Sequence, residues 1–192
     1  MPKPSLDARN KFSIARAEAL LGYTYIERAL SLLFASILGT RARYATLIIS
    51  KILNTRARNE LVQKIADDVT QKKFRTFTNS LFREISDLDG KRNMLVHWLI
   101  EVREDGVSVL RHPDPFGGSN VEMTERQLWE LASKASFLVS VINMFREYIT
   151  KPEKGDALRN IFLQPLSCPP EPHHPLYQMR RDNGLPLWPS QK

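Results

Sequence analysis

The chain has 192 residues, enough for one domain with its own hydrophobic core, and its single cysteine, Cys168, excludes both an internal disulfide and a cysteine-rich zinc site. Its 28 Lys and Arg residues outnumber 21 Asp and Glu residues, giving a formal net charge of +7 that favours a polyanionic partner. Because no apolar signal core is visible and the run ALSLLFASIL is too short for a membrane span, we expect a cytoplasmic protein without a membrane partner.

Apolar residues recur at helical spacing through the first half of the chain. They predict four helices, over about 13–38, 43–53, 57–69 and 72–88. The pair Asp89-Gly90 is expected to end the fourth helix, because Gly is common just past a helix end. A further helix is then expected to begin at Gly90, with free backbone N–H groups that favour an anion.

After His97 the pattern changes from helical spacing to alternation. Two β-prone runs flank Asp105-Gly106, which is a strong signal for a tight turn. The sequence therefore predicts a β-hairpin over about 99–111, in which Val102 pairs with Val109. This hairpin is inserted before the last helix of the domain.

A loop rich in Pro and Gly follows at 112–120. Thr124 with Gln127 three residues later is the signature of a capping box, in which two side chains satisfy the first backbone N–H groups of a helix. It predicts a last long helix over 125–149. The predicted architecture is all-α, an up-and-down helical bundle of residues 1–150 with a small inserted β-hairpin.

Residues 151–192 form a Pro-rich C-terminal tail, which holds eight of the 12 prolines. The tail also carries large apolar residues, which predict that it packs against the body or against a partner subunit instead of extending freely. These residues are Leu158, Ile161, Phe162, Leu166, Tyr177 and Trp188.

The familiar cofactor and hydrolase signatures are missing from the sequence: it has no Gly-rich phosphate loop, no HExxH, no CxxC and no nucleophile elbow. We therefore expect no cofactor and no metal. The carboxylates Glu84, Asp87 and Asp89 precede Arg92 closely, and paired carboxylates can hold magnesium or serve as acid and base. We favour the alternative in which Glu84 and Asp87 are solvated or pair with Arg on a helix rim.

The segment KRNMLVHWLI places Arg92, Asn93 and His97 within a run that otherwise resembles buried core. On a helix, Asn93 and His97 share a face, whereas Arg92 lies about 140° from His97 and must reach round. An imidazole can take the proton of a ribose 2′-hydroxyl or protonate a leaving 5′-oxygen, and a guanidinium can stabilise the charged phosphorane. The three residue types suit metal-free RNA cleavage.

A purely structural explanation of the same residues is also open. His97 can bond a backbone carbonyl on a half-buried face, and Arg92 can pair with Asp87 or Asp89. In that case neither side chain meets a substrate.

The stretch RNMLVH resembles the motif of the HEPN superfamily (higher eukaryotes and prokaryotes nucleotide-binding), which has an Arg, a polar residue, and a His four to six positions after the Arg. The resemblance covers roughly residues 13–150 and not the tail. It implies a homodimer of helical bundles whose motifs line one cleft, and a ribonuclease of bacterial toxin or phage-defence type with an antitoxin or sensor protein as further partner. It also implies catalytic roles for Arg92 and His97, with Asn93 in support.

The leading hypothesis is a metal-independent endoribonuclease that cleaves RNA through attack by the 2′-hydroxyl. The alternative is a non-catalytic HEPN-like module that binds nucleotide or RNA or mediates assembly, and a third is a purely structural helical protein. The hairpin interrupts the family's usual run into the last helix, so its Arg103, Arg111 and His112 are candidates either to contact RNA or to restrict the site.

Overall fold

A computed structural model describes residues 6–113, 121–151 and 156–183 of the chain. Within these ranges it contains seven helices and one three-stranded antiparallel sheet, which confirms the predicted helical bundle with a small β insertion. The helices are α1 (Leu6–Ile37), α2 (Ala42–Ser50), α3 (Thr55–Val69), α4 (Arg75–His97), α5 (Glu125–Thr150), α6 (Asp156–Phe162) and α7 (Pro175–Asp182). The strands are β1 (Leu99–Val102), β2 (Ser108–Arg111) and β3 (Glu122–Thr124).

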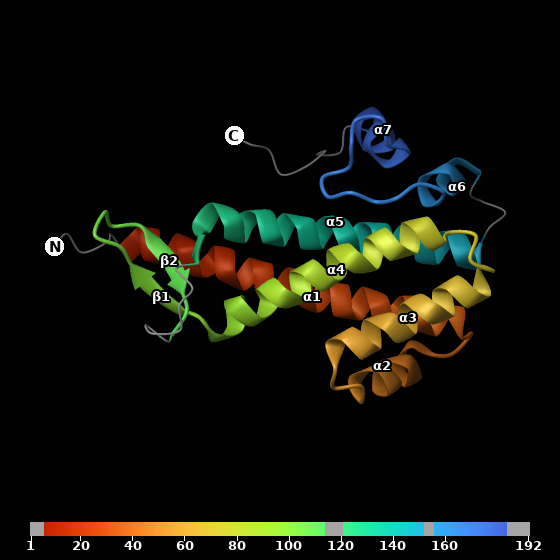
Figure 1. The fold of residues 1–192 in the computed structure, drawn as a ribbon, viewed down its shortest axis with the longest axis horizontal. Coiled ribbons are helices and arrows are strands. Elements are labelled where there is room, and N and C mark those ends of the chain that lie inside the picture. The colour runs from red at the N-terminus through yellow and green to blue at the C-terminus, as the bar shows by residue number, and fades with distance from the viewer. Residues whose placement is uncertain (1–5, 114–120, 152–155, 184–192) are drawn as a thin grey trace.

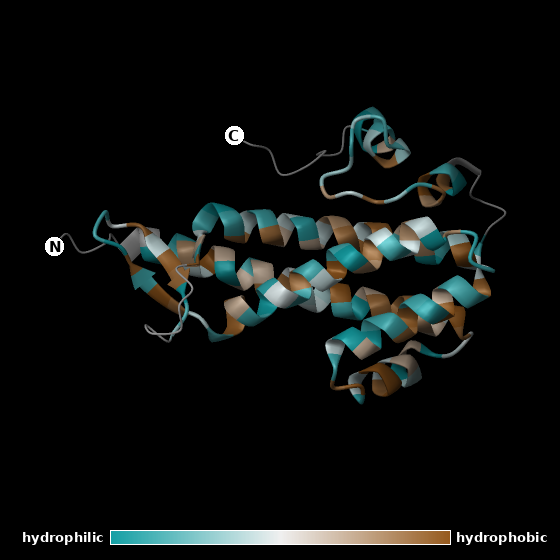
Figure 2. Cartoon of the chain, in the orientation of Figure 1, coloured by the Kyte–Doolittle hydropathy of each residue, from teal (hydrophilic) through white to brown (hydrophobic). Residues whose placement is uncertain are grey.

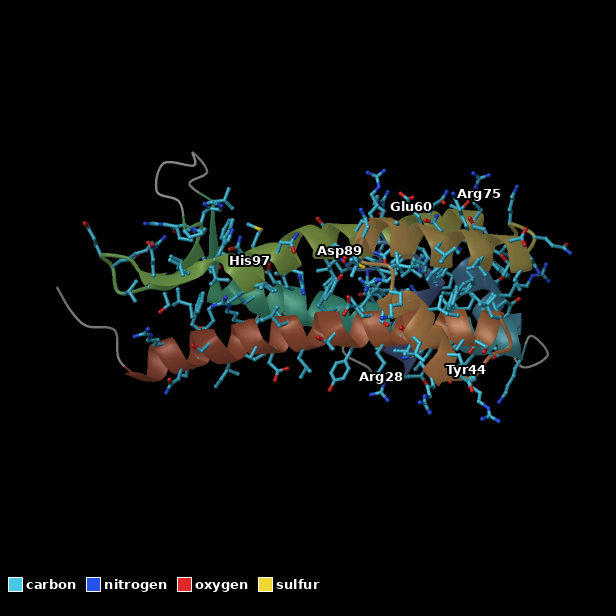
Figure 3. The ribbon with its side chains drawn as sticks, turned by 90° about the horizontal axis from the view of Figure 1, so that it is seen from below. Arg28, Tyr44, Glu60, Arg75, Asp89 and His97 are labelled. Atoms are coloured by element: carbon cyan, nitrogen blue, oxygen red, sulfur yellow. The ribbon has the colours of Figure 1, made fainter. Side chains whose placement is uncertain are left out.

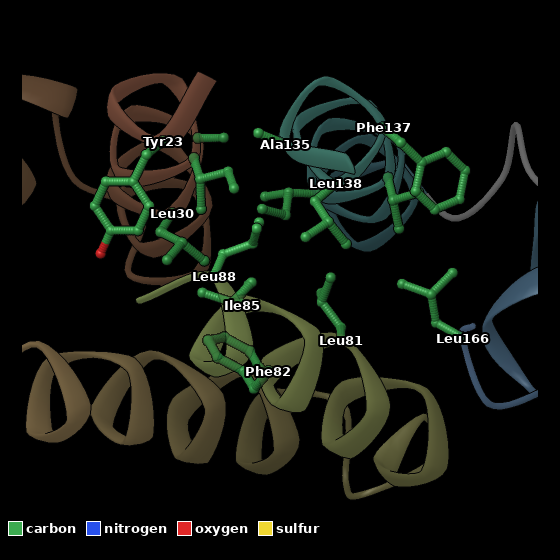
Figure 4. Close-up of a cluster of buried hydrophobic side chains, with 14 of the residues drawn as sticks. Tyr23, Leu30, Leu81, Phe82, Ile85, Leu88, Ala135, Phe137, Leu138 and Leu166 are labelled. Atoms are coloured by element: carbon green, nitrogen blue, oxygen red, sulfur yellow. The ribbon is translucent and has the colours of Figure 1, made fainter. Parts of the chain in front are cut away.

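The long helices α1, α4 and α5 form the body of the bundle (Figure 1). Helix α3 folds back on α4, α2 packs against α1, and the sheet closes the opposite end of the bundle. Polar residues cover much of the side of α3 and α4 that faces the viewer (Figure 2). The core between the three long helices is apolar, with Leu81, Ile85 and Leu138 fully buried (Figure 4).

Helices α1 and α5 approach each other closely at Gly22. A Cβ atom built on Gly22 would lie 2.8 Å from Cβ of Ala135, closer than side chains pack. Small residues at a helix crossing let the two backbones come together and bury more of their flanking side chains. Gly22 is therefore a packing position of the bundle.

Helix α4 does not end at Asp89-Gly90; it continues without a break from Arg75 to His97. The predicted stop at this pair, and the predicted new helix beginning at Gly90, are wrong. The Asp89 carboxylate accepts hydrogen bonds from Tyr23 and Asn59, so it does not compete with the backbone for local bonds. The packing of the flanking Leu88 and Leu95 outweighs the helix cost of Gly90, about 1 kcal/mol.

The two helical glycines provide a matched pair of substitutions. Gly90→Ala is expected to raise the free energy of unfolding by about 0.5–1 kcal/mol, because no described atom outside the adjoining helix backbone lies within 4 Å of the added Cβ and alanine favours the helix. Gly22→Ala gains the same propensity but overpacks the contact with Ala135, at a cost of about 1–3 kcal/mol. Urea denaturation should therefore rank Gly90→Ala above Gly22→Ala, and equal midpoints would contradict the packing assigned to Gly22.

The hairpin forms, but its register differs by one residue from the prediction. Val102 pairs with Ser108 and Val109 with Glu101, so the predicted pairing of Val102 with Val109 is wrong. The loop holds three residues instead of two, since the Arg103 N–H donates to the Val107 carbonyl at 2.9 Å and Gly106 adopts a φ of +82°. Such a loop, with Gly in the left-handed conformation, shifts the pairing by one position.

A third strand, β3, pairs with β2 immediately before α5, and the sequence did not predict it. The capping box at the start of α5 is confirmed, with Thr124 and Gln127 bonding to each other's backbone N–H groups. Most of the predicted 112–120 loop lies outside the described residues, as does Trp188 of the tail.

The described part of the tail packs against the body of its own chain. Phe162 is fully buried among aromatic rings of α4 and α5, with its centroid 4.9 Å from that of Phe77 and 5.1 Å from that of Phe145. Leu166 is also buried, and its N–H donates to the Ser80 hydroxyl at 2.7 Å. These contacts fix the segment over the α4–α5 seam, where Leu166 is seen beside the core in Figure 4.

No single helix of the described segments has both the length and the apolar composition to cross a membrane. The bent pair formed by Arg9–Ile37 and Ala42–Ser50 passes the same test when its two helices are taken together.

Candidate functional site

The last two turns of α4 expose Arg92, Asn93 and His97, while Leu95 between them is buried in the core. At 100° per residue, Asn93 and His97 continue one stripe of α4 that also includes Ser86. Figure 3 shows His97 and Asp89 on the α3–α4 side of the molecule, away from Arg28 and Tyr44. The side chains of Arg92, Asn93 and His97 are therefore exposed and do not belong to the hydrophobic core of their own chain.

A groove of about 740 Å³ runs between α3 and α4 and ends at the motif. Arg92 and Asn93 line it, whereas His97 lies just beyond, one turn further along α4. The groove is mostly polar, and two largely buried aromatic side chains, Tyr23 and Phe82, contribute apolar surface to it. The structure therefore brings Arg92 and Asn93 into one concave surface and places His97 next to its end.

The Arg92 guanidinium has no carboxylate partner in the parts of the chain that the structure describes. It lies over the ring of Tyr23, 5.9 Å from the centroid, and its Nη1 is 3.4 Å from Oδ1 of Asn93. Asp87 is engaged elsewhere, by Lys91 at 3.2 Å and Lys134 at 2.8 Å. The structural explanation in which Arg92 pairs with Asp87 or Asp89 is thus not what is found.

A polar network lies beside Arg92 at the junction of α1, α3 and α4. The Tyr23 hydroxyl donates to one oxygen of Asp89, and the Asn59 amide donates to the other at 2.8 Å. Burial raises the pKa of the Tyr23 phenol, and the bond to Asp89 raises it further. Burial also raises the pKa of Asp89, outweighing the opposing effects of its hydrogen bond from Tyr23 and of the nearby Arg58.

The raised pKa of Asp89 predicts a pH-dependent effect of Asp89→Asn on stability. A carboxyl group whose pKa is higher in the folded than in the unfolded chain stabilises the fold most at low pH, and this contribution is lost as pH rises through the folded pKa. The free energy of unfolding of Asp89→Asn relative to wild type should therefore increase from pH 4 to pH 7. Urea denaturation at the two pH values measures it, and a decrease would contradict the assigned direction.

The same carboxylate supplies the acceptors that hold the network together. Asp89→Ala leaves the largely buried Tyr23 hydroxyl and Asn59 amide without this acceptor, and an unsatisfied buried donor costs about 1–3 kcal/mol. The role of Asp89 at neutral pH is thus to fix Tyr23 and Asn59, and with them the floor beneath Arg92.

The C-terminal end of α4 is fastened to α1 by Arg16. Its Nε donates to the Leu95 carbonyl at 2.7 Å, and its Nη2 to the carbonyls of Val96 at 3.3 Å and Trp98 at 3.2 Å. The last carbonyls of a helix have no partner within the helix and carry partial negative charge, so a cation is well placed there. Arg16 thereby fixes the turn that presents His97, whose imidazole makes no hydrogen bond to another described residue.

Sequence reasoning did not identify Arg16 as part of the site. A signal for it exists, because Arg16 lies on the same face of α1 as the buried Phe12 and Tyr23. A cation in an apolar stripe predicts a buried or half-buried acceptor nearby.

The basic side chains of the hairpin are already engaged by the protein. Arg103 pairs with Asp105 and Glu122, and Arg111 pairs with Glu122 and, at 3.0 Å, with Glu101. The adjacent carboxylates raise the pKa of both guanidinium groups. Much of the charge that Arg103 and Arg111 would offer to RNA is thus compensated within the sheet.

The remaining hairpin candidate, His112, packs edge-on against Trp98, with ring centroids 5.9 Å apart. This contact connects the hairpin to the end of α4. It places His112 close to the motif in space but in contact with a largely buried ring.

The carboxylates upstream of the motif form ion pairs. Lys134 on α5 lies 2.8 Å from both Glu84 and Asp87, and they raise its pKa against the opposing effect of burial. Across residues 6–113, 121–151 and 156–183 no group of three His, Cys, Asp or Glu side chains is arranged to hold a metal. Burial raises the pKa of the Cys168 thiol to about 12, as expected for a structural cysteine.

Comparisons with protein-family models, with curated proteins and with solved structures find no match. The description of the protein therefore depends on its fold and its candidate site. It is a helical bundle that presents an Arg, an Asn and a His at the end of a polar interhelical groove.

Proposed function

We propose that the protein is a metal-independent endoribonuclease of HEPN type, with Arg92 and His97 as catalytic residues and Asn93 in support. The observation that carries the proposal is the exposure of all three side chains at the end of α4. Arg92 makes no ion pair with a carboxylate among the residues that the structure describes. The resemblance of RNMLVH to the superfamily motif supplies the reaction class.

The proposed reaction needs no group beyond the protein and the RNA. His97 takes the proton of a ribose 2′-hydroxyl, whose oxygen attacks the adjacent phosphorus. Arg92 stabilises the negative charge of the phosphorane, and Asn93 donates to a phosphate oxygen. The bond from phosphorus to the 5′-oxygen breaks, the leaving oxygen takes a proton from a second, protonated imidazole, and the products are a 2′,3′-cyclic phosphate and a 5′-hydroxyl.

A homodimer would complete this site, since one imidazole can act as base and a second as acid. Apolar residues that flank His97 support a subunit contact at this end of α4. Val96 and Leu99 have exposures of 41 and 54%. Apolar surface of this kind next to a polar site is typical of an interface. A bacterial toxin or antiviral effector in the cytoplasm, controlled by an antitoxin or sensor protein, fits this proposal.

The alternative is a non-catalytic HEPN-like module that binds nucleotide or RNA or mediates assembly. One observation favours it specifically: the groove includes Arg92 and Asn93 but not His97. Binding without cleavage would then be the function of the same surface.

Incubation of the purified protein with total RNA in EDTA tests the proposal. Wild type is expected to cleave RNA and to leave DNA of the same length intact, because DNA lacks the attacking hydroxyl. The 3′ ends should carry a cyclic phosphate, which resists a phosphatase until acid opens the ring. Intact RNA in every lane, or cleavage that requires a divalent metal, would contradict the proposal.

A further inference from the structure

The α3–α4 groove extends well beyond the residues that the proposed reaction uses. On α4 its lining residues run from Asn79 to Asn93, which corresponds to about 20 Å along the helix axis. A single phosphate at Arg92 would fill only one end of it. The remaining length is open to a ligand that continues from that phosphate.

The lining of the groove is rich in carboxamide side chains. They are Asn54, Asn59, Gln63, Asn79 and Asn93. Carboxamides offer donors and acceptors that complement the polar edge of an unpaired nucleobase. Part of this capacity is used within the protein, because Gln63 donates to Oδ1 of Asn79 at 2.7 Å and Oδ1 of Asn54 accepts from the Ala57 N–H at 3.0 Å. Asn59 is 3% exposed and donates to Asp89, so it belongs to the floor of the groove, and its buried Oδ1 has no hydrogen-bond partner in the described residues.

Basic groups lie along the rim of the same groove. The side chains of Arg56 and Arg83 are 87 and 71% exposed, and each makes one ion pair, to Glu60 at 2.9 Å and to Glu84 at 3.4 Å. The Arg56–Glu60 pair is exposed on both sides and such pairs contribute only about 0–1 kcal/mol, so Arg56 can turn to a phosphate at little cost. Arg83 has a long contact of 3.4 Å with a Glu84 side chain that is 16% exposed. The N-terminus of α3, at Thr55, also lines the groove and favours an anion.

We propose that the α3–α4 groove is a subsite for single-stranded RNA, which holds unpaired bases against the carboxamides and the backbone phosphates against Arg56 and Arg83. A strand bound in this way leads one phosphate to Arg92, beside His97. The choice of RNA as the ligand of this groove rests on the proposed ribonuclease function. Duplex RNA is excluded because its base edges are paired within the helix, where the carboxamides do not reach them.

Binding of a fluorescently labelled single-stranded 2′-O-methyl oligoribonucleotide, followed by anisotropy, tests the subsite without cleavage. Arg56→Gln is expected to raise Kd several-fold and to reduce the slope of log K against log salt by about 0.7, the loss of one phosphate contact. Arg126→Gln is the matched control, because Arg126 is 86% exposed and makes the same i,i+4 pair with Glu130, yet lies on α5 outside the groove. Equal effects of the two substitutions would overturn the proposal, as would duplex RNA that binds as tightly as the single strand.

Cleavage assays separate this inference from the proposed function. If wild type binds the single strand through Arg56 but leaves ordinary RNA intact, the subsite stands and the ribonuclease proposal fails. If RNA is cleaved and the double variant Arg56→Gln/Arg83→Gln keeps the KM of wild type, the ribonuclease stands and the subsite fails.

Discussion

Replacement of His97 by alanine is expected to reduce RNA cleavage by about 10²–10⁴-fold, the usual contribution of a general acid or base. The free energy of unfolding should stay within about 0.5 kcal/mol of wild type, because the His97 side chain is exposed and makes no described hydrogen bond. Single-turnover cleavage and urea denaturation of the same preparation measure the two quantities. A loss of activity without a loss of stability is what separates a catalytic from a structural His97.

The control for this substitution is His173→Ala. The side chain of His173 is 77% exposed in the tail, where it pairs with Glu171. Its removal should leave the cleavage rate unchanged. Arg92→Lys offers a second comparison with Arg92→Ala, since lysine keeps the charge but loses the planar fork that binds two phosphate oxygens. If His97→Ala and His173→Ala cleave equally well, the site lies elsewhere.

Replacement of Phe162 by alanine is expected to lower the free energy of unfolding by about 3–5 kcal/mol. Phe162 is fully buried, and its ring contacts those of Phe74, Phe77, Phe145 and Tyr148, which belong to or border α4 and α5. The substitution leaves a cavity at the point where the tail is fastened to the bundle. Limited proteolysis should accordingly cut the tail faster in the variant than in wild type.

The neighbouring Leu163→Ala provides the control for this prediction. Leu163 is 44% exposed and follows Phe162 directly, so its truncation removes an apolar side chain from the same segment without opening the core. Its effect should be below about 1 kcal/mol. Equal effects of the two substitutions would show that the tail contributes nothing specific to the core.

Features of the fold that depend on neighbouring residues could be predicted from the sequence. The start of α5 is the clearest case, because Thr124 and Gln127 bond to backbone groups only three residues away. The continuation of α4 through Asp89 could not be predicted. The acceptors of Asp89 are occupied by Tyr23, 66 positions away, and by Asn59, 30 positions away, and the burial of Leu88 and Leu95 in the core outweighs the helix cost of Gly90.

In the candidate site, too, features set by neighbouring residues could be predicted, and features set by distant residues could not. The exposure of Asn93 and His97 on one stripe follows from helical spacing, which depends only on the sequence of α4. The groove requires α3 to fold back on α4, and the fastening of the His97 turn requires Arg16, 79 positions before Leu95. The ion pairs that Arg103 and Arg111 make with Glu122 depend on β3, a strand of three residues that carries no periodic signal.

The most direct test uses a pool of random-sequence DNA oligonucleotides that each contain one ribonucleotide, incubated with the protein in EDTA. The proposed chemistry predicts a single cut on the 3′ side of the ribose by wild type, with a 2′,3′-cyclic phosphate on one product and a 5′-hydroxyl on the other. Arg92→Ala and His97→Ala should leave the pool intact. Cleavage at deoxyribose positions, or cleavage by His97→Ala at the rate of wild type, would contradict the assignment of this site.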